Sequence, residues 1–270
     1  MRIKLKEISF NRVYSALLRR LKNIPELYHW NSTKVGKDNQ REISKYKDIH
    51  KGERCFLIAN GPSIAKMDLS ILKNEFTFGM NRIYMIYDKL QFVPTYHFVT
   101  NELVLQQFAD DLKEVESIKF YNWTERRLFK AKKSLNFMRL KYSLTDLFSK
   151  NPEEGIYSGG TVTYATLQFI YYMGFSEVYI LGLDHSFKEK GQPNKTEVRH
   201  QEKDESHFHP NYFPKGSKWQ LPDLLRSEIA YKKAREAFEG DGRKIIDATD
   251  NGHCTVFEKK SFHSVVESIN

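Results

Sequence analysis

Cysteine is scarce in this chain of 270 residues, which contains only Cys55 and Cys254. Two cysteines cannot build a disulfide framework, and their separation does not match a metal-binding motif. Long apolar runs are also missing: no stretch of about 18 residues is apolar, and the N-terminus has no apolar core followed by small residues. We therefore expect a cytoplasmic protein without a transmembrane span, a secretory signal or a bound metal.

Two nucleotide-binding signatures are absent as well. The chain has no Gly-x-x-x-x-Gly-Lys-Ser/Thr loop, and no Gly-x-Gly-x-x-Gly follows the first apolar segment at 55–59. These absences argue against a P-loop kinase and against an ordinary dinucleotide-dependent dehydrogenase. A content of 40% hydrophobic and 14% aromatic residues nevertheless indicates a folded protein with a substantial core.

Acidic residues are nearly missing from the N-terminal segment 1–22, where Glu7 is the single acid among seven lysines and arginines. Apolar residues recur there at helical spacing, which predicts a basic amphipathic helix and then a polar linker, together residues 1–50. Such a helix can bind the anionic inner face of the cytoplasmic membrane, or pack on this protein or on a second subunit of a homo-oligomer. The net charge of +9 does not indicate nucleic acid binding, because no recognition helix or aromatic RNA-binding motif accompanies it.

Predicted strands and helices alternate from residue 51 onward. Strands are expected at 55–59, 76–80, 96–100, 118–121, 178–183 and 244–246. Helices are expected at 103–115, 162–173 and 228–238. This alternation is typical of an α/β fold, so we expect one Rossmann-like domain over residues 51–270, with helices on both faces of a mostly parallel sheet.

Polar residues follow four of these strands at the point where each ends. They are Asn60-Gly61, Asn81, Asn101 and Gly182-Leu183-Asp184. Because the carboxyl ends of parallel strands meet at one edge of a sheet, we expect these residues to converge in a polar cleft for a small molecule. Asn is also a common turn residue, so any one of these placements alone carries little weight.

The sequence Ser158-Gly159-Gly160-Thr161 precedes the apolar helix expected at 162–173. Backbone N–H groups, the helix dipole and two hydroxyls at such a start can hold a phosphate, which glycines allow close to the backbone. An ordinary N-cap with a tight turn would have the same sequence.

Residues 187–222, called the lid segment below, are polar and contain His200, His207, His209, Tyr212 and Trp219. A loop of this length inside a compact domain, with exposed aromatic residues, favours a lid over the cleft. An imidazole on a lid can act as a general base or acid, although loop histidines are often simply solvated. Zinc is not expected, because no cysteine or acidic cluster completes a ligand set.

Six motifs occur in a fixed order along residues 53–260: "LIANGPSI", "GMNRIY", "FVTNEL", "YSGGTVTYA", "YILGLDHSF" and "DESHFHPNYF". In series they resemble the bacterial sialyltransferases of glycosyltransferase family 42, and the related domain of Maf flagellin-glycosylation proteins and of 6-hydroxymethylpterin diphosphokinase MptE-like proteins. The resemblance implies a GT-A-like variant of the Rossmann fold. It also implies metal-independent transfer of a sialic-acid-like (nonulosonic) or related sugar from a CMP-activated donor to a hydroxyl of a surface glycan or glycolipid precursor.

The resemblance further implies roles for single residues. His207, in "SHF", matches the family's catalytic base, whereas the tyrosines expected after Gly-x-Asp are replaced by His185, Ser186 and Phe187. Tyr212, His209 or lid lysines could then stabilise the leaving phosphate, and we predict Tyr212 to be catalytic. The residues implied to bind the nucleotide or donor are Asn60, Gly61, Ser63, Asn81, Asn101, Ser158, Gly159, Gly160, Gly182, Asp184 and His185.

Two other functions remain open. A pterin-type diphosphokinase would use ATP and Mg²⁺ and would need acidic ligands, of which Asp184 is the one expected in the cleft. A non-catalytic nucleotide-binding protein would have no use for a histidine base in the lid segment.

Overall fold

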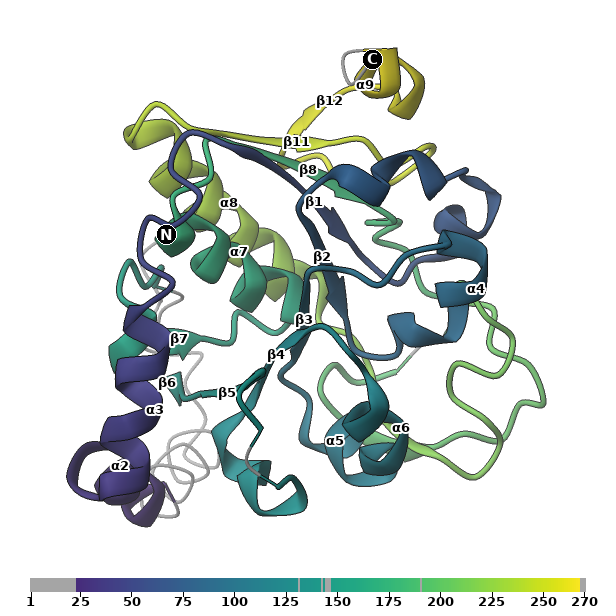
Figure 1. The fold of residues 1–270 in the computed structure, drawn as a ribbon. Helices are drawn as coiled ribbons and strands as arrows, with labels where there is room; N and C mark the ends of the chain where they lie inside the picture. The colour runs from purple at the N-terminus through teal and green to yellow at the C-terminus, as the bar shows by residue number, and fades with distance from the viewer. Residues whose placement is uncertain (1–22, 131, 142, 144–146, 190, 268–270) are drawn as a thin grey trace, which may run out of the picture.

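The computed structural model describes residues 23–130, 132–141, 143, 147–189 and 191–267 (Figure 1). Its centre is an eight-stranded sheet in the order β12-β11-β8-β1-β2-β3-β4-β5, in which every neighbouring pair is parallel. The strands are β1 Arg54–Ile58, β2 Thr77–Met80, β3 Tyr96–Val99, β4 Ile118–Asn122, β5 Leu135–Met138, β8 Glu177–Leu181, β11 Lys244–Asp247 and β12 Glu258–Lys259. The basic helix predicted at 1–22 lies outside the described residues.

Strand β1 lies inside the sheet and is apolar on both sides. Cys55 and Leu57 face one core, whereas Phe56 and Ile58 face the other. Successive side chains of a strand point to opposite faces, so a continuous apolar run is the pattern expected for a strand that is covered on both faces.

Helices cover both faces of the sheet (Figure 1). The first core lies under α2 Ile24–Ser32, α3 Lys34–Ser44, α7 Val162–Met173 and α8 Leu224–Gly240. The second lies under α4 Tyr87–Leu90, α5 Glu102–Gln107, α6 Ala109–Glu114 and α9 Phe262–Glu267. The predicted α/β class, with a parallel sheet between helices, is confirmed.

Short elements complete the described chain. They are the 3₁₀ helices Pro62–Lys66, Ser70–Asn74, Ile83–Ile86, Trp123–Leu128 and Pro152–Glu154, and the paired strands β6 Leu140–Lys141 and β7 Ile156–Tyr157. The single helix expected at 103–115 is wrong, because Phe108 separates α5 from α6 with φ −123°. The ring of Phe108 lies under the guanidinium of Arg82, 3.7 Å from it, so a tertiary contact accompanies the break.

The polar stretch expected as a linker is helical instead. Thr33 ends α2 and caps α3, where its hydroxyl accepts a hydrogen bond from the Gly36 backbone N–H. Trp30 is fully buried and packs edge-on against Trp123, with ring centroids 5.0 Å apart. Asn39 pairs with both backbone groups of Phe137 on β5. These distant contacts stabilise helices that the local sequence does not predict.

The lid segment packs onto the second core. Strands β9 Thr196–Val198 and β10 Lys218–Gln220 form an antiparallel pair in it. Its aromatic side chains were expected to be exposed, but Phe208, Tyr212, Phe213 and Trp219 are buried. Burial of apolar area on this face of the sheet accounts for the difference. None of the helices within the described ranges is long and apolar enough to cross a bilayer.

Candidate active site

The carboxyl edge of the sheet has a topological switch point beside β1. From β1 the chain adds β2 to β5 on one side, and β8, β11 and β12 lie on the other. Ligands of open α/β sheets bind outside the carboxyl ends of strands at such a point. The loops that follow β1 and β8 meet here, where the Gly61 backbone N–H donates to the Gly182 carbonyl across 3.0 Å.

Asp184 connects these two loops. Its carboxylate accepts hydrogen bonds from the Ser63 backbone N–H at 3.2 Å and from the Ser63 hydroxyl at 2.7 Å. A side chain at Gly61 would place a Cβ atom 1.9 Å from the Asp184 carboxylate. Gly182 has φ +74°, and a Cβ there would lie 2.3 Å from a methyl group of Ile64. Both glycines are therefore required for the loops to approach each other.

Asn60 and Asn81 lie at corresponding places after adjacent strands, because Ile58 is paired with Gly79. The side-chain oxygen of each is buried and has no hydrogen-bond partner among the described residues. A buried acceptor without a partner is costly, so a donor group supplied by a bound molecule would stabilise both oxygens.

Asn81 is held in a left-handed conformation, with φ +50°. Its carbonyl accepts a hydrogen bond from Nε2 of the buried His97 at 2.8 Å. Burial lowers the pKa of His97 to about 3, so this imidazole is neutral. His97, which the sequence did not single out, thus fixes the backbone that presents Asn81.

The side-chain oxygens of Asn101 and of the turn before α7 accept hydrogen bonds from backbone N–H groups two residues further along the chain. The Asn101 side-chain oxygen caps α5 by accepting from the Leu103 backbone N–H at 2.9 Å. The Ser158 hydroxyl accepts from the Gly160 N–H at 3.2 Å, and the Thr161 hydroxyl accepts from the Thr163 N–H at 3.3 Å. Gly159 and Gly160 have φ +55° and +78°, so the turn has the backbone form that glycine permits.

His207 is paired with Asp204 in the lid segment. Nδ1 of His207 lies 3.0 Å from the Asp204 carboxylate, which can only accept, so Nδ1 carries the proton. In the neutral ring Nε2 is then a free base, and no described residue forms a hydrogen bond with it. The sequence Asp204-x-x-His207 also forms a turn, because the same carboxylate accepts from the Ser206 and His207 backbone N–H groups.

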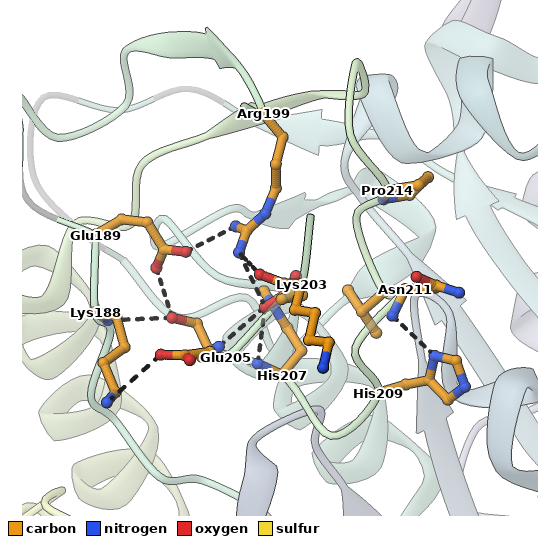
Figure 2. A network of polar contacts seen from close by, with 12 residues as sticks. Lys188, Glu189, Arg199, Lys203, Glu205, His207, His209, Asn211 and Pro214 are labelled. Carbon is orange, nitrogen blue, oxygen red and sulfur yellow. Dashed lines mark hydrogen bonds and ion pairs between the residues drawn. The ribbon is translucent and has the colours of Figure 1, made fainter. Parts of the chain in front are cut away.

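Arg199, Glu189 and His207 belong to one network of polar contacts (Figure 2), in which Asp204 pairs with Arg199 and His207. Arg199, with a side chain only 1% exposed, lies 2.7 Å from Glu189 and 3.6 Å from Asp204. The Ser206 hydroxyl donates to the second oxygen of Glu189. Burial by itself raises the pKa of Asp204, but the hydrogen bond from His207 and the charges of His207 and Arg199 outweigh it and hold the pKa below its usual range.

Two contacts bring His207 to the carboxyl edge of the sheet. The Phe208 backbone N–H donates to the Asn60 carbonyl at 3.1 Å. The ring of His207 stacks on Tyr212, whose hydroxyl accepts from the Arg82 backbone N–H at 3.4 Å. The Arg82 guanidinium donates to the carbonyls of Asn211 and Tyr212. Arg82, two residues after β2, therefore holds the lid segment against the carboxyl edge of the sheet through these hydrogen bonds.

Tyr212 is buried under His207 and supports its ring. Its side chain is 1% exposed, and burial raises its pKa above the usual range, so the phenol stays protonated. The other two lid histidines have fewer contacts. His200 is exposed, and Nδ1 of His209 accepts a hydrogen bond from the Asn211 backbone N–H. Within the described ranges, no three His, Cys, Asp or Glu side chains are grouped so as to hold a metal ion.

His185 makes a second pair with a carboxylate. Its Nε2 lies 3.1 Å from Glu228 on α8. Sequence reasoning missed Glu228, together with Arg82, Arg199 and Asp204. Two of these four residues lie in quoted motifs: Arg82 follows Asn81 in "GMNRIY", and Asp204 shares its motif with His207 at a spacing that favours an Asx turn.

Comparisons with known proteins concern the family and the fold of this chain. Residues 29–190, more than half of the chain, match the family model described as 6-hydroxymethylpterin diphosphokinase MptE-like. The structure is similar to that of the MAf glycosyltransferase from Magnetospirillum magneticum AMB-1, with a TM-score of 0.51 and 15% sequence identity. That match covers 95% of this chain and 43% of the other, so the chain spans less than half the length of this solved relative. A search of curated proteins found no significant match.

The predicted relation to Maf and MptE-like proteins is confirmed, whereas the resemblance to glycosyltransferase family 42 stays a prediction. The chain belongs to the 6-hydroxymethylpterin diphosphokinase MptE-like family.

Proposed function

We propose that this protein is a glycosyltransferase that moves a nonulosonic or related sugar from a CMP-activated donor to a hydroxyl of a surface glycan precursor. The observation that carries the proposal is the His207–Asp204 pair at the carboxyl edge of the sheet. Nε2 of His207 carries no proton in the neutral ring, and the next residue, Phe208, is hydrogen-bonded to Asn60 at the edge where nucleotide-binding α/β proteins hold their ligands. The fold shared with the MAf glycosyltransferase is compatible with it.

The chemistry assigned to His207 is general-base catalysis. Nε2 takes the proton of the acceptor hydroxyl while that oxygen attacks the anomeric carbon of the donor. The bond from this carbon to the phosphate oxygen breaks, its electron pair stays on that oxygen, and CMP leaves. Asp204 offsets the positive charge that develops on the imidazole and keeps the proton on Nδ1.

The donor would lie across the ends of β1, β2 and β8. The unpartnered oxygens of Asn60 and Asn81 would accept from amino or hydroxyl groups of the nucleotide or sugar. Asp184, ordered by Ser63, offers its remaining lone pairs to ribose hydroxyls.

A second candidate follows from the family description, which names a 6-hydroxymethylpterin diphosphokinase. His207 would then deprotonate the pterin's primary hydroxyl, and that oxygen would attack the β-phosphorus of ATP. The bond from the β-phosphorus to the oxygen that bridges it to the α-phosphorus would break, and AMP would leave with that electron pair. Mg²⁺ can be bound by one or two carboxylates together with substrate phosphates, and Asp184 is the acid suited to that role.

The proposed location is the cytoplasm, at the inner face of the membrane, where lipid-linked acceptors are found. Ile24, Leu27 and Tyr28 on α2 and Val35 on α3 are exposed apolar side chains. They follow directly on the basic segment 1–22, whose charge complements an anionic lipid surface. We propose that this surface binds anionic lipid.

A nucleotide panel separates the two functions. Thermal unfolding would be followed with CMP, CDP, CTP, UDP, GDP and ATP, each with EDTA and with Mg²⁺, because a ligand of the folded state raises its melting temperature. Stabilisation by CMP or CDP that survives EDTA supports the glycosyltransferase. Stabilisation by ATP with Mg²⁺ alone supports the diphosphokinase and overturns the first proposal.

A further inference from the structure

His185 is held in an unusual place directly after Asp184 at the end of β8. Its backbone has φ +54°, a left-handed conformation that is uncommon for a residue other than glycine. The imidazole is only 5% exposed, and Nε2 lies 3.1 Å from Glu228, whose side chain is 35% exposed. Strain of this kind persists where the surroundings fix it, and it often marks a functional position.

The surroundings of His185 connect β8 with the turn before α7. The ring lies beside Tyr231 of α8, with centroids 6.1 Å apart. The Tyr231 hydroxyl lies 3.4 Å from the Thr161 hydroxyl, at the start of α7. A Cβ at Gly160 would lie 3.4 Å from Arg226, the cation on the first turn of α8. Tyr231 therefore links His185 to the turn whose sequence predicts a phosphate site.

The hydrogen-bonding roles of the two ring nitrogens follow from Glu228. A carboxylate only accepts, so Nε2 carries a proton and Nδ1 is the nitrogen left for a ligand. The protonated ring donates from Nδ1, and a charge-assisted bond to an anionic oxygen is stronger than a neutral one.

Resting on the proposed function, we infer that His185, positioned by Glu228, donates from Nδ1 to the phosphate of the leaving CMP. As the bond between the anomeric carbon and the phosphate oxygen breaks, its electron pair remains on that oxygen, and the imidazolium stabilises the added negative charge. His207 accepts the proton of the acceptor hydroxyl. One histidine therefore acts on the attacking oxygen and the other on the leaving phosphate. Glu228 acts as a positioning residue.

The test compares CMP with cytidine, which lacks the phosphate, by calorimetry on the full chain. His185→Asn suits the left-handed backbone, since Asn tolerates it, and Glu228→Ala leaves that backbone untouched. Each should weaken CMP binding by about tenfold or more and leave cytidine binding unchanged. Glu228→Gln keeps an acceptor and should restore much of the affinity. The double variant should bind CMP no more weakly than His185→Asn alone.

A matched control exists on α9, where His263 and Glu267 form an exposed pair at the same 3.1 Å distance. His263→Asn and Glu267→Ala should change neither affinity. Equal losses for CMP and cytidine, or unchanged CMP binding in His185→Asn, would overturn the role of His185. Wild-type protein that binds ATP but not CMP would instead overturn the proposed function, and the same variants tested with ATP and adenosine would then decide whether His185 contacts a phosphate.

Discussion

The imidazole of His207 lies face to face on the phenol ring of Tyr212, with centroids 4.1 Å apart and planes only 2° from parallel. Phe213 and Phe187 approach the same imidazole edge-on, at 5.4 and 6.0 Å. The lid segment thus places its base in an aromatic pocket, where the rotation of the ring is restricted by packing as well as by Asp204.

Removing the Tyr212 hydroxyl should leave the reaction nearly intact. Tyr212→Phe keeps the stacked ring and loses the hydrogen bonds of the hydroxyl with the Arg82 backbone and the Asn81 side chain, so we expect a loss of about 1–2 kcal/mol in unfolding free energy and a similar kcat. Tyr212→Leu removes the ring under His207 and should lower kcat about tenfold or more. Steady-state kinetics of both variants measure this. A large loss of kcat in Tyr212→Phe would instead assign a catalytic role to the hydroxyl.

His207→Ala should lower kcat by about 10²- to 10⁴-fold, the range that a general base usually contributes. Asp204→Asn should approach this loss, because the amide can donate to Nδ1 and turn the ring to the wrong tautomer. His209→Ala, on the same segment, is the control and should retain turnover. Full activity in His207→Ala would remove the proposed mechanism.

Gly61→Ala should prevent nucleotide binding. The added methyl group would overlap the Asp184 carboxylate, so the loops after β1 and β8 must separate, at a cost of about 1–3 kcal/mol in stability. Gly240→Ala, where a Cβ meets no atom within 4 Å, is the matched control. Thermal unfolding with and without CMP measures both effects, and unchanged CMP stabilisation in Gly61→Ala would contradict the assigned role of this loop.

Acid should destabilise the protein through His97. Its pKa falls from an ordinary value of about 6.5 to about 3 on folding, so in that interval the unfolded chain binds the proton first. Stability is therefore full above about pH 6.5 and declines as the pH drops, by about 1.4 kcal/mol per pH unit at most. Urea unfolding at several pH values should show a steeper decline in wild type than in His97→Gln. Equal slopes would mean that His97 is not buried in the neutral form.

Anionic vesicles should bind the protein through its N-terminal surface. Replacing Ile24, Leu27 and Tyr28 by Ser removes exposed apolar area from α2, and should reduce cosedimentation with phosphatidylglycerol vesicles severalfold. Leu225→Ser, an exposed apolar residue on α8, is the control. Retained vesicle binding in the triple variant would contradict the role of these side chains, and equal binding to neutral vesicles would contradict the proposed preference for anionic lipid.

Much of the fold was predictable because its signals are local. The apolar run at β1 and the turn residues Asn60-Gly61 and Gly182-Leu183-Asp184 identify strand ends from a few neighbours. Helices α2 and α3 depend on contacts between residues far apart in sequence, Trp30 with Trp123 and Asn39 with Phe137. The local sequence therefore predicts a linker where the structure has two helices.

Some residues of the candidate site could be predicted from the sequence and others could not. Gly61, Ser63, Gly182 and Asp184 meet as expected, because each lies next to a strand end. The Arg82 guanidinium donates to the carbonyl of Asn211, 129 residues away in the lid segment, and to that of Tyr212. These contacts are seen only in the folded chain. Glu228 likewise reaches His185 across 43 residues. Such partners have no signature in a single sequence.

The hydrogen bond from Phe208 to Asn60 also joins two modules of the chain. The family match ends at residue 190, before Asp204 and His207, so it covers the loops after β1 and β8 but not the pair that we propose as the base. Under the proposed function, the loops inside the family region bind the nucleotide and the segment after it supplies the base, so the boundary at residue 190 separates the nucleotide-binding residues from the base.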